Sequence, residues 1–375
     1  MAGQTQSEES EGPVDVLIIG AGASGAAIAW SLAETKMHIV CLEQGALMNP
    51  LLYPSAGRDY EARAAGDFAV SPNVRKLPVD YPINEVDSPI KVANFNGVGG
   101  GTVLYAGHFP RFHPSDFRTR TLDGVGDDWP VEYQTLAPFY ADNEKMTGVA
   151  GLAGDPAYPP DNASRVPPLP LGKAGDVLAD GFNQLGWHWW PSDTAIITED
   201  YDGRARCINL GACGSGCAQG AKGSADVTYW PHAQRAGVEL RTRCRVREIT
   251  VDDEGQATGA IYFDAHGQVH HIAAHMVILA CNGVGTPRLL LNSTSPKHPD
   301  GLANSSGLVG KNLMFHPYAL IQGVFEQETD GHAGPFKLMR SQEFYETDNK
   351  RGFVRGYTLE IQRGMAPVRT AQSGL

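Results

Sequence analysis

Long apolar runs are missing from this sequence. A helix needs about 20 consecutive apolar residues to cross a bilayer, whereas the apolar run that begins at Val14 stops after Ile19, where a glycine segment begins. The first residues, MAGQTQSEESEGP, are acidic and polar, without the basic region, the apolar region or the twin arginine of an export signal. The sequence therefore predicts no membrane span, a short disordered lead over 1–12 and a cytoplasmic location.

Positive charge and cysteine are also scarce. The 30 Lys and Arg residues against 42 Asp and Glu give a formal net charge of −12, and nucleic acid is not an expected partner because its binding needs a basic face. Of the six cysteines, three fall in or beside apolar strand patterns: Cys41, Cys244 and Cys281. Such buried thiols are usually inert. Without an export signal, a disulfide framework is not expected.

Glycine, in contrast, is abundant, and residues 20–25 read GAGASG, a G-x-G-x-x-G motif. We expect an apolar strand before it over 14–19, a helix after it over 26–34, and a second strand over 38–42 that leads into Glu43. In a dinucleotide-binding βαβ unit the three glycines permit the tight turn, the approach of a pyrophosphate and close helix packing. The helix N-terminus offers N–H groups to the phosphates, and Glu43 lies where a carboxylate accepts the ribose hydroxyls. This unit alone leaves FAD and NAD both open.

A second glycine segment follows in 94–112, NFNGVGGGTVLYAGHFPRF. So many glycines in a row indicate positive φ angles or a close approach of the backbone to a ligand. Successive N–H groups in such a turn can form an anion-binding concavity. The alternative is a flexible surface loop, but the apolar residues on both sides favour a ligand-binding loop.

The remaining pattern alternates helices and strands. Helices are expected around 55–68, 133–147, 173–185, 227–236 and 288–292, and strands over 239–251, 259–263, 269–272, 276–280, 318–325 and 352–362. Turn signals such as Asp252-Asp253-Glu254-Gly255 separate the strands between 239 and 272, which is typical of a β-meander.

Five segments, in this order, resemble the glucose–methanol–choline (GMC) flavoprotein oxidoreductases. They are the βαβ unit at 14–43, VGGGTVLYAGHFPRF, GDDWPVEYQTLAPFYADNE, HMVILACNGVGTPRLLLNS and GLVGKNLMFHP, and the resemblance extends to Pro317. It implies an α/β fold: a Rossmann-like FAD-binding domain with a parallel sheet plus a β-meander, and a partial α+β substrate domain. We expect the FAD domain at 13–50, 91–120 and 205–312 and the cap or substrate domain at 51–90, 121–204 and 313–375.

The resemblance also implies the cofactor, FAD, and the residues that bind it. These are Gly20, Gly22, Ala23, Ser24, Gly25, Glu43, Gln44, Gly99, Gly100, Gly101, Thr102, Tyr105, Ala106, Val246, Ala280 and Asn282, with the main chain near Val246 beside the adenine. Some sugar-oxidising relatives bond their flavin covalently through a histidine in the second glycine segment. Leu104 stands at that position, so we expect non-covalent FAD.

The implied reaction is oxidation of an alcohol or sugar hydroxyl to a carbonyl. A general base removes the hydroxyl proton while hydride passes to flavin N5, and a quinone or a protein then accepts the electrons, although an oxidase using O₂ is also open. The family's catalytic histidine lies in a pattern similar to H-x-x-G-T-x-x-M-G, with a His or Asn partner further on, and this arrangement does not occur in the 375 residues. We therefore expect either a chain that ends part-way through the substrate domain or an FAD-binding chain that needs a further segment. His108 and His316 are weak substitutes for the base.

Cys207, Cys213 and Cys217 form a cluster in CINLGACGSGCAQGAKGS. A zinc site usually has a tighter C-x-x-C knuckle and a fourth ligand. Some membrane-linked sugar dehydrogenases of the family hold a three-iron cluster in a comparable loop, so an iron–sulfur site is an alternative. We favour a structural turn, which many relatives without a cluster carry, and expect no metal.

Overall fold

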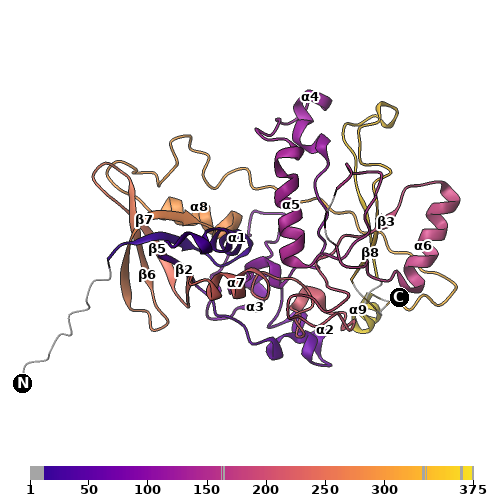
Figure 1. Cartoon of the computed structure of the whole chain (residues 1–375), viewed down its shortest axis with the longest axis horizontal. Helices are drawn as coiled ribbons and strands as arrows, with labels where there is room; N and C mark the ends of the chain where they lie inside the picture. The colour runs from indigo at the N-terminus through magenta and orange to yellow at the C-terminus, as the bar shows by residue number, and fades with distance from the viewer. Residues whose placement is uncertain are drawn as a thin grey trace, which may run out of the picture. The chain divides into compact units, whose positions relative to one another are not determined.

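The structure is a computed structural model that describes residues 12–161, 163, 165–331, 334, 336–363 and 366–373 (Figure 1). Residues 1–11 of the expected lead lie outside this range. The chain forms two compact units. The first comprises residues up to Leu47, Asn96–Gly100 and Tyr229–Pro317, and the second comprises Met48–Phe95, Gly101–Thr228 and the residues from Tyr318 on.

A six-stranded sheet forms the first unit, in the order β4-β2-β1-β7-β6-β5. Its strands are β1 (Val14–Ile19), β2 (Ile39–Glu43), β4 (Glu239–Thr242), β5 (Arg245–Val251), β6 (Ala257–Phe263) and β7 (Val269–Leu279). β1 pairs in parallel with β2 and with β7, and β2 pairs in parallel with β4. β5, β6 and β7 form an antiparallel meander. The α/β fold with a parallel sheet plus a β-meander is thus confirmed.

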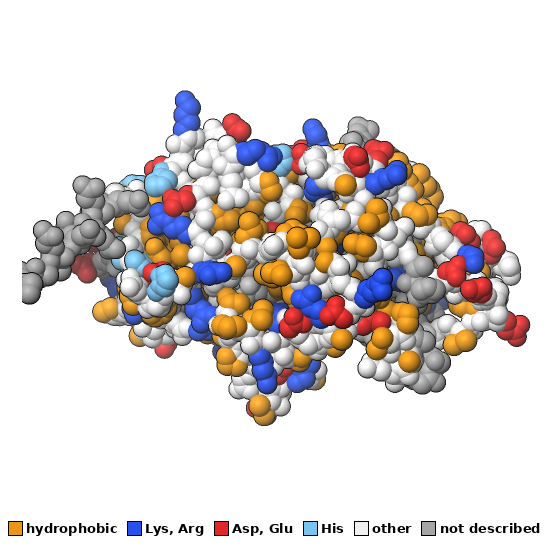
Figure 2. Space-filling model, turned by 90° about the horizontal axis from the view of Figure 1, so that it is seen from below, with side chains coloured by type: hydrophobic (Ala, Val, Ile, Leu, Met, Phe, Trp, Pro, Cys, Tyr) orange, Lys and Arg blue, Asp and Glu red, His pale blue; other side chains and the backbone are white. Residues whose placement is uncertain are grey.

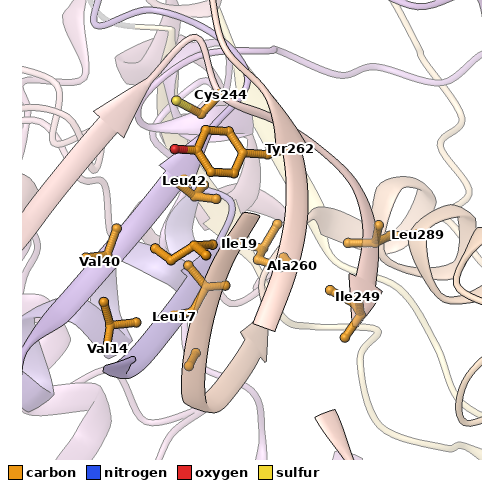
Figure 3. Close-up of a cluster of buried hydrophobic side chains, with 12 residues drawn as sticks. Val14, Leu17, Ile19, Val40, Leu42, Cys244, Ile249, Ala260, Tyr262 and Leu289 are labelled. Carbon is orange, nitrogen blue, oxygen red and sulfur yellow. The ribbon is translucent and has the colours of Figure 1, made fainter. Parts of the chain in front are cut away.

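The core of this unit gathers side chains of β1, β2 and the meander strands together with one residue of a helix (Figure 3). Its buried side chains come from β1, β2 and the meander and include Leu17, Leu42, Ile249 and Tyr262. α8 (Asn282–Asn292) contacts β5 and adds Leu289 to this core. α1 (Ala23–Leu32) contacts α7 (Tyr229–Arg235), and the rings of Trp30 and Tyr229 lie edge to face with their centres 5.6 Å apart.

Some strand boundaries differ from the expectation. The strand expected over 239–251 is two strands, because Arg243 has a φ of +58° and its N–H donates to Gly45 O. Conversely, 269–272 and 276–280 belong to one strand, β7, whose first half pairs with β6 and whose second half pairs with β1. α8 begins earlier than expected because Asn282 Oδ1 accepts the N–H groups of Val284 and Gly285.

The second unit contains a small antiparallel sheet, β3-β8-β9, made of β3 (Trp190–Pro191), β8 (Lys337–Ser341) and β9 (Leu359–Gln362). Its α-helices are α2 (Tyr60–Ala65), α3 (Pro72–Arg75), α4 (Thr119–Asp123), α5 (Tyr133–Thr147), α6 (Gly172–Leu185) and α9 (Pro367–Ser373). Short 3-10 helices of the chain are η1 (Ala33–Thr35), η2 (Pro50–Leu52), η3 (Pro54–Ala56), η4 (Gly100–Val103), η5 (Pro114–Arg118), η6 (Cys213–Ser215) and η7 (Asn349–Arg351). α6 buries Ala179 and Phe182 against Met339 of β8.

Three expectations for the second unit are wrong or only partly right. Residues 318–325 are exposed and belong to no strand. The helix expected around 55–68 is limited to α2, and the strand expected over 352–362 is limited to β9. The compact units place 101–120 and 205–228 outside the first unit, whereas the sequence assigned these residues to the FAD domain; that assignment remains a proposal.

Within the described residues, no helix is long and apolar enough to span a membrane. On the face drawn in Figure 2, acidic and basic side chains are interspersed.

Candidate cofactor site

The end of β1 turns sharply into α1, and this turn requires glycine at two positions. Gly20 has a φ of +102°, and a Cβ there would lie 2.5 Å from Ala280 O. A Cβ on Gly25 would lie 1.9 Å from Gly20 O, so α1 can approach the strand only without a side chain at this residue. The strand-to-helix turn is therefore fixed by backbone contacts that other residues would break.

The second glycine segment lies directly against the first. Gly99 N–H donates to Ala21 O at 2.9 Å, and Val98 N–H donates to Ala46 O at 3.1 Å. Gly100 has a φ of +51°, and a Cβ on it would lie 2.9 Å from the Cα of Gly22. Two stretches that are far apart in the sequence thus form one backbone cradle.

α1 opens onto this cradle. The helix begins after Gly22, without a side-chain cap and without an acidic residue in its first turn. Gly22 is half-buried, whereas Ala23 and Ser24 are exposed. The first N–H groups of a helix have no intrahelical acceptor, and together with the helix dipole they favour an anion such as a phosphate.

Glu43 lies behind the cradle and is 6% exposed. Its Oε2 accepts from Ala21 N–H at 2.9 Å and its Oε1 accepts from Gly45 N–H at 2.8 Å. Burial raises the pKa of Glu43, and the backbone N–H groups that the carboxylate accepts partly oppose this rise. Glu43 therefore holds the first glycine turn to the segment after β2, besides being placed at the end of β2 where a ribose acceptor is expected.

We expect Glu43→Gln to weaken FAD binding. A glutamine keeps the shape but loses the charge and one of the two acceptor oxygens, which costs about 1.5–3 kcal/mol for a charge-assisted hydrogen bond. The measurement is the FAD dissociation constant from flavin fluorescence. Glu34→Gln, on the exposed η1, is the matched control and should leave this constant unchanged. A dissociation constant in Glu43→Gln equal to that of the wild type would contradict the role of Glu43.

Three other expected residues of the first unit, Gln44, Ala280 and Asn282, follow the ends of β2 and β7. Gln44 Nε2 donates to Asn96 Oδ1 at 2.5 Å, and Ala280 N–H donates to Ile19 O at 2.8 Å. Asn282 is exposed and has a φ of +65°, and its Oδ1 accepts the N–H groups of Val284 and Gly285 in the first turn of α8. Val246 lies in β5 opposite Tyr262, next to a break in the register.

Gly101, Thr102, Tyr105 and Ala106 belong to the second unit. Thr102 Oγ1 accepts from Ala225 N–H at 2.9 Å, and Tyr105 OH donates to Gly223 O at 2.7 Å. Gly101 is exposed, with open space where a Cβ would stand. Leu104 is buried in an apolar cluster with residues such as Tyr53 and Phe95.

Trp230 is a residue of the first unit that the sequence patterns did not indicate. Its indole Nε1 donates to Ala21 O at 2.9 Å, and the side chain is buried. Ala21 O thus accepts both from Trp230 and from Gly99. The expected helix over 227–236 includes Trp230, but nothing in its periodicity points to the glycine turn.

The two histidines considered as a base have different surroundings. His108 Nε2 lies 3.1 Å from Glu360 Oε1, and His108 Nδ1 is buried without a hydrogen-bond partner among the described residues. The hydrogen bond from His108, followed by that from Lys337, lowers the pKa of Glu360 to about 2. His316 is exposed and belongs to the first unit. A catalytic role for either residue remains a prediction.

The six cysteines are free thiols. Burial raises the pKa of Cys41, Cys207, Cys213, Cys244 and Cys281, that of Cys281 to about 11, which disfavours the reactive thiolate. Cys207, Cys213 and Cys217 are half-buried free thiols. In the part of the chain that the structure describes, no group of three or more His, Cys, Asp or Glu residues is arranged to hold a metal ion. The structural turn and the iron–sulfur alternative both remain predictions.

Comparison with known proteins bears directly on this site. The GMC oxidoreductase family model matches residues 14–318. The chain is 43% identical over 363 residues to 2-methyl-1,2-propanediol dehydrogenase of Mycolicibacterium austroafricanum, with 95% of this chain and 65% of the relative covered. It is 30% identical over 379 residues to the fructose dehydrogenase large subunit of Gluconobacter japonicus, with 96% and 70% covered. A formate oxidase variant of Aspergillus oryzae matches with a TM-score of 0.47 at 16% identity, over 75% of this chain and 47% of that one.

The chain therefore belongs to the GMC oxidoreductase family, as its motifs indicated. The prediction of FAD as the cofactor is confirmed with it, since members of this family are FAD-binding flavoproteins. The chain spans 65% and 70% of the length of the two curated relatives.

Proposed function

We propose that this protein oxidises an alcohol or a sugar hydroxyl to a carbonyl with FAD. The observation that carries the proposal is the backbone cradle, in which the Gly99–Gly100 segment lies against the Gly20–Gly25 turn with Glu43 behind it. The names of the relatives, a diol dehydrogenase and a fructose dehydrogenase subunit, support hydroxyl groups as the substrate class. Bound FAD supplies the acceptor for the hydride that leaves the substrate carbon.

The chain's own residues would bind and orient FAD. The N-terminus of α1, at Gly22, Ala23 and Ser24, would receive the pyrophosphate, and Glu43 would accept the ribose hydroxyls. Gly99 and Gly100 would cover the pyrophosphate, and the main chain at Val246 would lie beside the adenine. Gly101 to Ala106 would follow the ribityl chain and the flavin.

We propose that the flavin is held without a covalent bond. The aliphatic side chain of Leu104 offers no nucleophilic atom and is buried in an apolar cluster. Acid precipitation of the yellow protein should leave the flavin in the supernatant; flavin that stays with the precipitate would contradict this proposal.

Reduction by substrate is the test of the function. The purified chain, loaded with FAD, is mixed under anaerobic conditions with 2-methyl-1,2-propanediol, with fructose and with simple alcohols. Bleaching of the flavin absorption by one of them supports an oxidoreductase, and reoxidation by a quinone analogue but not by O₂ supports a dehydrogenase. Bound FAD that no alcohol or sugar reduces would favour the alternative, an FAD-binding chain that needs a further segment for catalysis.

The electron acceptor and the location complete the proposal. We propose a quinone or a protein as acceptor and the cytoplasm as location. Activity with ubiquinone analogues in a soluble fraction, compared with the membrane fraction, tests both at once.

A further inference from the structure

Lys222 is a charged residue in the interior of the second unit. It is 1% exposed, and its Nζ donates to three backbone carbonyls, Val103 O, Tyr105 O and Cys213 O, each at 2.7 Å. An ammonium group has three N–H donors. All three are used by backbone oxygens, which leaves Lys222 no capacity to bind a substrate.

These carbonyls come from two loops. Val103 and Tyr105 follow the exposed Gly101 in the second glycine segment, whereas Cys213 begins η6. The ammonium of Lys222 also lies 5.0 Å from the centre of the Tyr105 ring. The side chains of Thr102 and Tyr105 also form hydrogen bonds to the backbone of the segment 223–225. Lys222 is therefore the charged centre of a set of bonds that attaches 102–105 to 222–225.

Burying the ammonium group of Lys222 costs free energy of desolvation. Removing a charge from water costs several kcal/mol in real proteins, and burial lowers the pKa of Lys222 to about 8, partly opposed by Cys213, Cys217 and Asp226. A methionine would fill nearly the same volume without this cost. The charge has a specific task here, because only an ammonium can donate to three carbonyls from one point.

The direction of the Tyr105 carbonyl has a consequence for the next residue. A trans peptide is planar, and its C=O and N–H point to opposite sides. With Tyr105 O directed to Lys222, the N–H of Ala106 is directed away from Lys222. Ala106 is one of the residues expected to contact FAD. Lys222, on one side of the loop, therefore determines the direction of the Ala106 N–H on the other side.

We propose that Lys222 is a positioning residue for FAD, which acts through the carbonyls of Val103 and Tyr105 and fixes the backbone that faces the flavin. This inference rests on the proposed function, in which 101–106 follow the flavin. A positioning residue differs from one that only stabilises the fold. Replacing Lys222 should change how FAD is bound and not only how much folded protein remains.

The test compares Lys222→Met and Lys222→Gln with wild type in the full chain. Lys145→Met, on the exposed side of α5, is the control. Three quantities are measured: the FAD dissociation constant by fluorescence, the visible circular dichroism of the bound flavin, and thermal unfolding of the apo-chain. We expect Lys222→Met to raise the dissociation constant at least about tenfold and to alter the flavin dichroism. Lys222→Gln, which keeps two N–H donors, should be intermediate.

If Lys222→Met binds FAD with wild-type affinity and with unchanged flavin dichroism, the inference about Lys222 is overturned while the proposed function stands. Failure of the wild-type chain to bind FAD would overturn the proposed function and the inference with it. Should Lys222→Met not fold, Lys222→Gln decides, because its apo-chain unfolding and its FAD affinity are measured separately. A glutamine variant that loses thermal stability but binds FAD as wild type does would identify Lys222 as a structural residue only.

Discussion

Gly22→Val is expected to abolish FAD binding while the apo-chain stays folded. Gly22 has φ −74° and ψ −164°, a conformation that any residue adopts. A Cβ there would meet only Gly100 Cα, at an ordinary 3.8 Å. The valine methyl groups would instead occupy the half-open space before α1, where the pyrophosphate must approach the backbone. Flavin content after purification and thermal unfolding of the apo-chain measure the two parts of this prediction.

Gly25→Ala is the matched comparison. Its new methyl group would lie 1.9 Å from Gly20 O, so α1 cannot keep its place and we expect loss of soluble, folded protein. The pair separates the two roles of glycine in one motif, since one position serves the ligand and the other serves the fold. Normal flavin content in Gly22→Val would refute the placement of the pyrophosphate.

Arg340→Ala is expected to cause the largest loss of stability in the second unit. Arg340, on β8, is 2% exposed and donates through Nη1 to Asp193 at 2.6 Å and through Nη2 to Asp155 at 2.9 Å. Its guanidinium also lies 5.1 Å from the centre of the Tyr158 ring. Removing one partner of a buried ion pair costs about 3–5 kcal/mol, because the remaining carboxylates keep their desolvation cost. Denaturant unfolding of the full chain measures the change.

Arg118→Ala provides the control for this prediction. Arg118 pairs with Asp128 at 3.9 Å, and the two side chains are 44% and 25% exposed. An exposed pair of this kind contributes about 0–1 kcal/mol. A loss of stability in Arg340→Ala no larger than that in Arg118→Ala would contradict the role assigned to the buried network.

Local patterns in the sequence predicted the parts of the fold that depend on nearby residues. The observed bounds of β1 and of α5 coincide with the expected 14–19 and 133–147. β1 is an apolar run that ends at a glycine, and α5 ends at Gly148, whose positive φ stops a helix. The sequence showed both glycine segments of the cradle. It did not show that they touch, because the contact between Gly99 and Ala21 joins residues far apart in the chain.

The small sheet of the second unit could not be predicted in the same way. β8 reads KLMRS and is buried throughout, although it holds Lys337 and Arg340. Neither charged residue fits an apolar strand pattern. Both can be buried because their charges pair with Glu360, Asp155 and Asp193 on other segments, which the sequence of β8 does not show. The role of Lys222 has no signature in the sequence either. Its acceptors are backbone carbonyls, which leave no mark in the sequence.

The position of β7 also determines when the first unit can fold. Val14 of β1 pairs with Ala274 of β7, and Val40 of β2 pairs with Glu239 of β4. At a ribosomal rate of about 5–20 residues per second, roughly 10–50 s pass between the synthesis of β1 and that of β7. During this interval the edge of β1 that later pairs with β7 stays apolar and unpaired. Such edges are the surfaces that chaperones cover and that aggregation uses. Completion of the six-stranded sheet is therefore a late event in the life of the nascent chain, and slow elongation before β7 prolongs the period of risk.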